Sequence, residues 1–242
     1  MSGVGIVTAL RSEANCVTSL RLPYNKMVSV GDDSSVWFCG IGGDAARTAA
    51  TGLHAGGVHA LVSFGIAGAL DSSLKPGDLV LPESIHAEQI QPVTLAWRSR
   101  LQQLLPSHLK IVGGTLASSP VTLTSEKVKR ELATATGACA VDMESGAIAD
   151  VAANAGIPFI AIRAIIDPVE FSPPIAMLSA IYPDGSVNSM RLLALILKRS
   201  VSLSELIHLA KGMHAARNTL STVIQSAGIG LGHEPTDNSV IY

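Results

Sequence analysis

The sequence predicts an α/β fold in which at least part of the sheet is parallel. Short apolar segments alternate with segments of helical pattern, which is the order expected when helices connect parallel strands. Hydrophobic residues make up 48% of the 242 residues and charged residues 15%, so the chain can bury a large aliphatic core without a disulfide or a metal. The sequence contains no internal repeat and no long linker, and we expect a single domain over residues 1–227.

Six short apolar segments are expected to form the strands. They are Val4–Leu10, Val36–Cys39, Ala60–Phe64, Asp78–Leu81, Ile111–Ala117 and Phe159–Ile166. The first ends at Arg11-Ser12-Glu13, whereas the second and third run into glycine loops at Gly40–Gly43 and Gly65–Gly68. The sixth is apolar except for Arg163, as expected of a central strand that is buried on both faces.

Two helices are expected between these strands. Asp44–Ala55 is rich in Ala and follows the first glycine loop. Val141–Ala155 ends at Gly156-Ile157-Pro158, where a glycine stop is followed by a proline that cannot continue the helix. Ligands in such sheets bind where strands end and helices begin, because unpaired backbone N–H groups and the helix dipole meet there. Each glycine loop taken alone is equally compatible with a tight turn.

The C-terminal segment 191–225 combines helical spacing with positive charge. The residues that would share an apolar stripe are Leu203, Leu206, Ile207, Ala210 and Met213, and the basic residues are Arg191, Lys198, Arg199, Lys211 and Arg217, against the single acid Glu205. The favoured interpretation is a helix that covers the core with its charged side chains in solvent. The alternative is a basic amphipathic segment that rests on an anionic membrane surface. Residues 228–242 are expected to be a disordered tail.

Composition argues against several classes of function. The net charge of −2 gives no support for nucleic acid as a partner. Cys16, Cys39 and Cys139 are far apart and match neither a disulfide framework nor a zinc site, and no metal-ligand cluster is expected. The N-terminal residues lack a signal-peptide pattern, and no apolar run reaches the roughly 18–20 residues that span a bilayer. We expect a cytoplasmic protein, peripheral at the inner face of the membrane if the basic segment binds lipid.

Two acidic motifs carry the strongest chemical signal. The first is AVDMES at Ala140–Ser145, where Asp142 and Glu144 flank Met143, and the second is RAIID, which places Asp167 where a strand ends. Carboxyl groups at two such points can hold a sugar and protonate its leaving group, which predicts an enzyme that cleaves the glycosidic bond of a nucleoside. The structural alternatives are a helix first turn that attracts negative charge and a turn cap before Pro168.

Five motifs in order resemble the nucleoside phosphorylase family, which includes purine nucleoside phosphorylases and methylthioadenosine/S-adenosylhomocysteine nucleosidases. They are GIVTALRSE at Gly5–Glu13, CGIGGDAA at Cys39–Ala46, SFGIAGALDSSLKPGDLVLPE at Ser63–Glu83, AVDMESGAIADVA at Ala140–Ala152 and PFIAIRAIID at Pro158–Asp167. The C-terminal third, with YPDGS at Tyr182–Ser186, is most similar to the hopanoid-associated branch, whose expected role is removal of adenine from adenosylhopane.

The resemblance implies a three-layer α/β/α sandwich around a mixed, partly barrel-like sheet, and it implies catalytic roles. Asp167 matches the general acid that protonates N7 of the leaving base. Glu144 matches the ribose-binding glutamate, with Met143 as an apolar wall under the sugar, whereas Asp142 is expected to face away from the pocket. Glu13 matches the nucleosidase glutamate that activates the attacking water.

The attacking group and the base pocket depart from the family pattern. Arg11 lies near the position of a phosphate-binding arginine, and the N–H groups of Gly42 and Gly43 could hold phosphate, but Ile66 replaces the hydroxyl residue that many relatives carry in the second glycine loop. Ser63 is too early in the sequence to substitute for it. Both hydrolysis and phosphorolysis therefore stay open.

The remaining expected contacts of the substrate come from the second glycine loop and from the segment 119–122. They are Gly65, Ala67, Gly68, Val121 and Thr122, and because this segment lacks the usual aromatic residue, the base-stacking partner is expected to be Phe159 or a neighbouring subunit.

The expected partner is a small purine nucleoside, which in the hopanoid branch is lipid-linked. No cofactor is expected, because water or inorganic phosphate is the only co-substrate that the reaction needs, and a homo-oligomer is expected. The alternatives are a methylthioadenosine/S-adenosylhomocysteine nucleosidase, another purine nucleoside phosphorylase, and a non-catalytic module that binds nucleosides.

Overall fold

The computed structural model describes residues 3–173, 176, 180, 182, 186, 188–198 and 200–234. The strands are β1 (Gly3–Thr8), β2 (Met27–Ser29), β3 (Ser34–Phe38), β4 (Val58–Ala69), β5 (Leu79–Val80), β6 (Ser84–His86), β7 (Ile90–Pro92), β8 (Ile111–Val112), β9 (Thr115–Ser118), β10 (Ala138–Asp142) and β11 (Phe159–Asp167). The helices are α1 (Arg11–Val17), α2 (Gly43–Ala55), α3 (Leu95–Leu104), α4 (Glu126–Thr136), α5 (Ser145–Ala155), α7 (Ser189–Leu197) and α8 (Leu203–Ala227).

All these strands belong to one mixed sheet with β4 at its centre. Strand β4 pairs in parallel with β1 and β11 and antiparallel with β10. The sheet branches at β4, since β11 pairs with β4 and then antiparallel with β5, and the two ends of the sheet do not meet. Every residue of β11 is buried, as predicted for a central strand. The predicted α/β fold with a mixed sheet is thus confirmed, and the sheet is unclosed.

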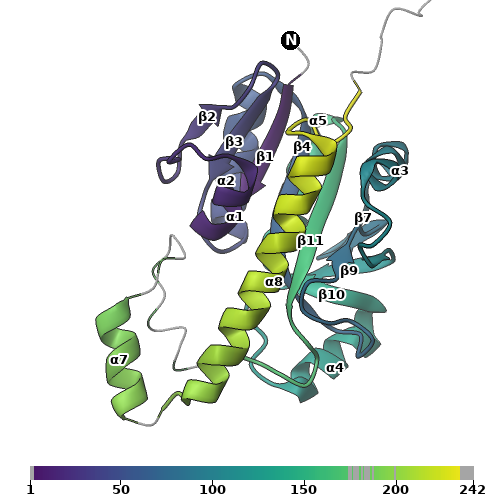
Figure 1. Cartoon of the computed structure of the whole chain (residues 1–242). Helices are drawn as coiled ribbons and strands as arrows, with labels where there is room; N and C mark the ends of the chain where they lie inside the picture. The colour runs from purple at the N-terminus through teal and green to yellow at the C-terminus, as the bar shows by residue number, and fades with distance from the viewer. Residues whose placement is uncertain are drawn as a thin grey trace, which may run out of the picture.

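Helices cover both faces of the sheet, which gives three layers (Figure 1). One core joins β4 and β11 to helices α2 and α5, which pack against each other. A second core, on the opposite face, joins the same strands to α1, α3 and α8. The small side chains of α2 and α5, mostly Ala, let these two helices lie close to the sheet and to each other.

Strand register brings the two acidic motifs together. Asp167 at the end of β11 lies opposite Gly68 of β4, and on the other side of β4 the same glycine lies opposite Val141 of β10. Asp142 ends β10, and α5 begins three residues later. Because β1 also ends at this edge of the sheet, helix α1 starts beside the same place.

Several predicted boundaries are wrong. The second glycine segment, Gly65–Gly68, is not a loop, because its residues continue the β4 ladder with β11. Arg11–Glu13 opens helix α1, and the predicted helix over 141–155 begins only at Ser145 because Val141 and Asp142 still pair with β9. The segment Ile111–Ala117 is split into β8 and β9 at Gly113 and Gly114.

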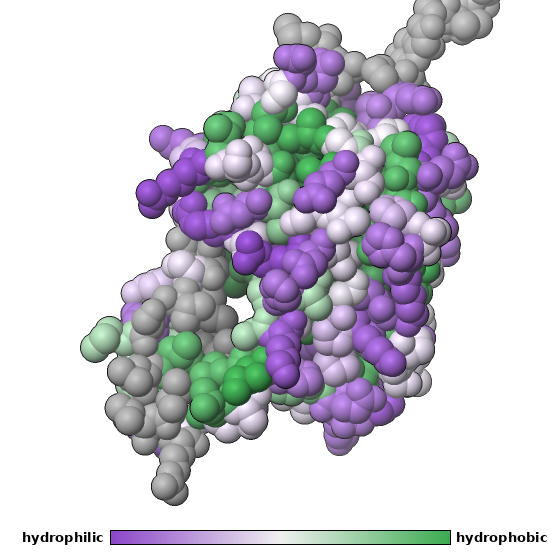
Figure 2. Space-filling view, in the orientation of Figure 1, coloured by the Kyte–Doolittle hydropathy of each residue, from purple (hydrophilic) through white to green (hydrophobic). Residues whose placement is uncertain are grey.

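The C-terminal helix α8 has two different halves. From Gly212 onward it is packed on β11, and a Cβ at Gly212 would overlap the carbonyl oxygen of Ile166. Before Gly212 the helix has no buried residue among those described, and Leu203 and Ile207 are 65% and 47% exposed. Figure 1 shows this half running away from the sheet toward α7, and Figure 2 shows hydrophobic surface at its lower end.

The chain continues beyond α8 as a packed segment over residues 228–234, in contrast to the disordered tail expected over 228–242. Residues 228–234 turn back onto α3, where the indole Nε1 of Trp97 donates a hydrogen bond to the carbonyl oxygen of Leu231 at 2.8 Å. Leu231 is fully buried, and the ring of His233 packs edge-on against Trp97. The rest of that segment, 235–242, lies outside the described residues, as do Arg199 and most of the YPDGS motif. Across the described chain, no helix is both long and apolar enough to cross a membrane.

Candidate active site

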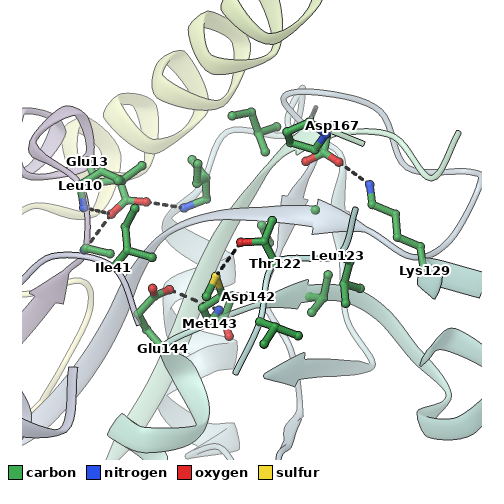
Figure 3. Close-up of a pocket in the computed structure, with 18 residues that line it drawn as sticks. Leu10, Glu13, Ile41, Thr122, Leu123, Lys129, Asp142, Met143, Glu144 and Asp167 are labelled. Atoms are coloured by element: carbon green, nitrogen blue, oxygen red, sulfur yellow. Dashed lines mark hydrogen bonds and ion pairs between the residues drawn. The ribbon is translucent and has the colours of Figure 1, made fainter. Parts of the chain in front are cut away.

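A cavity of about 200 Å³ lies at the edge of the sheet where β1, β10 and β11 end. Residues from segments far apart in the sequence line the cavity, and they include Glu13, Glu144 and Asp167 (Figure 3). The three carboxyl side chains are buried, with residue exposures of 3%, 9% and 5%. Buried carboxyl groups are uncommon unless they are paired or hydrogen-bonded, so the partners of each group define what it can do.

Asp167 stands at the end of β11 and is paired with a buried lysine. Its Oδ2 accepts a hydrogen bond from Nζ of Lys129, which comes from the first turn of α4. Burial raises the pKa of the Asp167 carboxyl, and the charge of Lys129 opposes that rise. The carboxyl is thus sheltered and able to hold a proton, as a group that protonates a leaving base must be.

Glu144 precedes α5 and binds the first glycine loop. Its Oε1 accepts a hydrogen bond from the backbone N–H of Gly42 at 2.8 Å, and its Oε2 accepts a longer one from Met143 at 3.3 Å. Burial, followed by the negative charge of Asp142, raises the pKa of Glu144 to about 7. The carboxylate can therefore accept hydrogen bonds from a hydroxyl group in the cavity, but it is not fully ionised at neutral pH.

Glu13 lies in the first turn of α1 and accepts three backbone hydrogen bonds. Oε2 binds the N–H groups of Ala9 and Leu10 at 2.9 and 2.8 Å, and Oε1 binds that of Ile66 at 2.9 Å. Gly65 permits this approach, since a Cβ at that position would stand 2.5 Å from Oε1. The burial of Glu13 raises its pKa despite these bonds, so the group has a fixed orientation and an increased affinity for a proton.

A network of hydrogen bonds around the buried Arg163 adjoins the cavity. The guanidinium of Arg163 binds Asp142 through Nε at 2.8 Å and through Nη2 at 2.7 Å, and Nη2 also donates to the hydroxyl groups of Ser63 and Ser145. Its positive charge lowers the pKa of both Glu13 and Glu144 and so offsets part of the effect of burial. Asp142 lines the cavity, contrary to the expectation that it faces away, but its carboxylate is occupied by this network.

Most of the expected substrate contacts meet at the cavity. Met143, Ala67, Gly68, Val121 and Thr122 all line it. Thr122 donates a hydrogen bond from its hydroxyl to the sulfur of Met143 at 3.5 Å, which joins the segment 119–124 to the start of α5. Gly65 lies against the Glu13 carboxyl group and is not one of the described residues that line the cavity.

Four expected residues are placed differently. Arg11 turns away from the cavity, donating to the carbonyl oxygen of Leu22 and lying over the ring of Phe38. The Gly42 N–H is used by Glu144, and Gly43 packs near Ala147 at the start of α2. Phe159 is buried at the opposite end of β11 from Asp167, eight residues away along an extended strand, so it does not reach the cavity as a base-stacking residue.

Lys129 is a charged residue of the cavity that the sequence patterns do not identify. It lies on a helix that was not predicted, between charged residues that read as a solvated surface: Glu126, Lys127, Arg130 and Glu131. The amphipathic spacing of this segment, EKVKRELATAT, was the available signal for a helix, but nothing in it marks the lysine as buried. In the described part of the chain, no group of three His, Cys, Asp or Glu side chains could hold a metal.

Solved structures of other proteins share the fold of this chain. The nucleosidase of Neisseria meningitidis that acts on 5'-methylthioadenosine and S-adenosylhomocysteine is 16% identical, with a TM-score of 0.71 over 96% of this chain and 100% of that chain. The futalosine hydrolase of Helicobacter pylori strain 26695 is 18% identical, with a TM-score of 0.66 over 93% and 97%. The corresponding nucleosidase of Helicobacter pylori is 19% identical, with a TM-score of 0.65 over 93% and 98%.

Sequence comparison identifies the family. No curated protein sequence matches the chain. A family model described as the phosphorylase superfamily matches residues 27–197, which is more than half of the chain and includes Glu144, Asp167 and the first glycine loop. This family match agrees with the fold that the chain shares with the nucleosidases. The chain belongs to the phosphorylase superfamily.

Proposed function

We propose that the protein hydrolyses the N-glycosidic bond of an adenine nucleoside. The observation that carries this proposal is the meeting of three buried carboxyl groups, Glu13, Glu144 and Asp167, around one cavity. A module that only binds nucleosides has no use for a sheltered carboxyl group at the leaving base and a second one on the attacking side. Burying such groups costs stability, which favours a catalytic function for them.

Each group has one role in the proposed reaction. As the bond between C1′ and N9 breaks, its electron pair moves into the purine ring and Asp167 transfers a proton to N7. Positive charge develops at C1′, and the nearby carboxylate of Glu144 stabilises it while accepting hydrogen bonds from the sugar hydroxyls. Glu13 takes a proton from the water that attacks C1′, for which its raised pKa and its fixed orientation are suited.

The surroundings of the cavity support water rather than phosphate as the attacking group. A phosphate dianion needs unpaired N–H donors or cations. Here the Gly42 N–H binds Glu144, Arg11 faces Leu22 and Phe38, and Lys129 is paired with Asp167. The similarity to the hopanoid-associated branch favours phosphate instead, so phosphorolysis is the alternative.

The apolar residues that line the cavity favour a nucleoside that carries an apolar group. Ile41 and Val121 line the cavity and are 39% and 62% exposed, and Leu10 and Ile66 also line it. We propose adenosylhopane as the substrate, following the branch that the C-terminal third resembles. A methylthio or homocysteinyl group at the 5′ position, as in the substrates of the related nucleosidases, is the alternative. A second subunit of a homo-oligomer is the proposed source of the base-stacking side chain.

The release of adenine tests the proposed function. Purified protein is incubated with adenosine, methylthioadenosine, S-adenosylhomocysteine and adenosylhopane, and free adenine is measured by chromatography. We expect release from at least one of them and a loss of about 10²–10⁴ in turnover in Asp167→Asn, with the fold retained. Asp44→Asn, the same change at an exposed position of α2, is the control.

Two outcomes would contradict this proposal. A near-normal rate in Asp167→Asn would remove Asp167 from the mechanism. Tight binding of a nucleoside, detected by calorimetry, without release of adenine from any of the four compounds would identify a binding module instead of an enzyme.

A further inference from the structure

Lys129 is a buried lysine to which the proposed reaction gives no role. It is 2% exposed and is one of the largest fully buried side chains of the described chain. A lysine is almost never buried completely unless its charge is compensated, because taking an ammonium group out of water is costly. Its contacts should therefore show what the buried charge does.

The contacts of Lys129 match a charged ammonium group. Its Nζ donates to Oδ2 of Asp167, to the carbonyl oxygen of Pro168 at 2.9 Å and to that of Phe171 at 2.8 Å. An ammonium group has three N–H donors, and each of them has one acceptor here. A neutral amine would leave one of these oxygens without a donor. Lys129 thus has no N–H left for a phosphate or for a substrate oxygen.

The same contacts leave one oxygen of Asp167 available. Oδ2 is held by Lys129, whereas Oδ1 accepts no hydrogen bond from the described residues. Both oxygens lie next to Gly68, with Oδ1 at 3.4 Å and Oδ2 at 3.6 Å from the point where a Cβ would stand, and Gly68 and Asp167 both line the cavity, so Oδ1 is the cavity-side oxygen without a bonded donor in the described chain. Figure 3 shows the Asp167 carboxyl at the cavity wall with Lys129 on one side of it.

We propose that Lys129 is a positioning residue for Asp167. The ammonium group of Lys129 holds one carboxyl oxygen of Asp167 so that the other oxygen faces the leaving base. This inference rests on the proposed function of Asp167 as the proton donor. The titratable groups that act on Asp167 are Lys129 from α4 and, more weakly, His208 from α8, whose ring stacks on Phe171 with centroids 4.4 Å apart. Both lower the pKa that burial raises, so Lys129 prevents the carboxyl from holding its proton too tightly for transfer.

A purely structural role is the competing explanation. Lys129 also ties residues 168–171 to the start of α4, and the loss of that tether alone could reduce activity by loosening the cavity wall. The two roles differ in one observable. Only a lysine that acts on the proton of Asp167 changes the pH at which the acid loses that proton.

The test compares three variants over a range of pH. Lys129→Met removes the charge, Lys129→Arg keeps it, and Lys127→Met makes the first change at an exposed position of the same helix. The basic limb of kcat/KM for adenine release reports deprotonation of Asp167 in the free enzyme. We expect Lys129→Met to lower kcat at least tenfold and to move this limb upward by about 1–3 pH units, the usual effect of losing a neighbouring opposite charge. Lys129→Arg should keep the limb near its original pH, and Lys127→Met should resemble the wild type.

A direct titration makes the test independent of turnover. The Asp167 carboxyl carbon is observed by NMR in the unliganded wild type and in Lys129→Met, or in Lys129→Gln if the first variant does not fold. An upward shift of its pKa supports the proposal, and an unchanged titration together with a lower melting temperature overturns it in favour of the tether. A wild type that releases no base contradicts the proposed function, so the two failures are distinguishable.

Discussion

Glu13, Glu144 and Asp167 show how burial and fixed hydrogen bonds act together on a single side chain. Burial is the largest influence on each of the three carboxyl groups and raises the pKa of all of them. What differs is the compensation: Arg163 lowers the pKa of Glu13 and of Glu144, backbone N–H groups add to this effect, and Asp167 has Lys129 instead. Because these partners differ, three carboxyl groups in one cavity can carry different charges at one pH.

Glu144 should reduce stability at high pH. Its pKa is about 7 in the folded protein against 4.5 for an unperturbed glutamate, so the folded state binds the proton more tightly than the unfolded state. The stabilising contribution is therefore complete below pH 4.5 and is lost as the pH rises through 7. We expect Glu144→Gln to be more stable than the wild type by about 1–3 kcal/mol at pH 9, and this difference to shrink at pH 5.

Denaturant unfolding at the two pH values measures this effect. Glu88→Gln removes an exposed carboxyl group and is the control, for which we expect no difference between the two pH values. If Glu144→Gln followed the wild type at both pH values, Glu144 would not carry the unfavourable buried charge that its surroundings indicate. The same variant should lose activity, since its amide cannot balance positive charge at C1′.

At the scale of elements, strand positions decide which side chains meet. The pairing of Gly68 with Asp167 on one side and Val141 on the other places RAIID beside AVDMES, although the motifs are about twenty residues apart. Sequence patterns predicted the apolar strands and the Ala-rich helix because their cores are aliphatic and regular. They did not predict α4. They also could not mark Lys129 as buried, because the burial of a lysine depends on a tertiary partner, here Asp167 at the end of β11.

The glycine segments illustrate the same limit. Gly65–Gly68 has the composition of a loop, yet it stays in the sheet because β11 pairs with each of its residues. Its glycines are required by neighbours: Gly65 leaves space for the Glu13 carboxylate, and Gly68 faces Asp167. A single sequence does not distinguish a glycine that permits a turn from a glycine that permits a close approach.

The N-terminal half of α8 and helix α7 form a candidate membrane-binding surface. Met190, Leu203 and Ile207 are 76%, 65% and 47% exposed, and Lys211 lies on the same stretch of α8. Exposed apolar side chains beside basic ones favour attachment to an anionic bilayer, at about 1 kcal/mol for each basic residue near the surface. We expect the protein to sediment with anionic liposomes but not with neutral ones, and less so at high salt.

A charge-matched pair of variants tests this expectation. Changing Lys198 and Lys211 to Gln should abolish sedimentation, whereas changing the exposed Lys75 and Lys127 to Gln alters the net charge equally and should not. Equal binding by the two variants, or equal recovery with neutral and anionic vesicles, would contradict a membrane role for this surface. The hydrophobic surface next to α7 would then need another partner.

In the whole molecule, the buried carboxyl groups come from a strand end, a helix first turn and the residue before a helix, and they meet at one edge of the sheet. The fold class and the choice of Glu13, Glu144 and Asp167 as candidate site residues were available from the sequence, because motif order and aliphatic strands carry that information. The orientation of Arg11 and the remote place of Phe159 were not, because both follow from packing against distant residues. The orientation of Arg11, the engaged N–H of Gly42 and the pairing of Lys129 with Asp167 are the reasons to favour water as the attacking group.

The dependence of the reaction on phosphate tests this central claim most directly. The best nucleoside substrate is incubated with the wild type in buffer freed of phosphate and in buffer with added phosphate, and both the base and the sugar product are analysed. We predict equal rates of adenine release and a free sugar in both buffers. Adenine release only with phosphate, together with a sugar 1-phosphate, would contradict hydrolysis and would require an anion site that forms when the substrate binds.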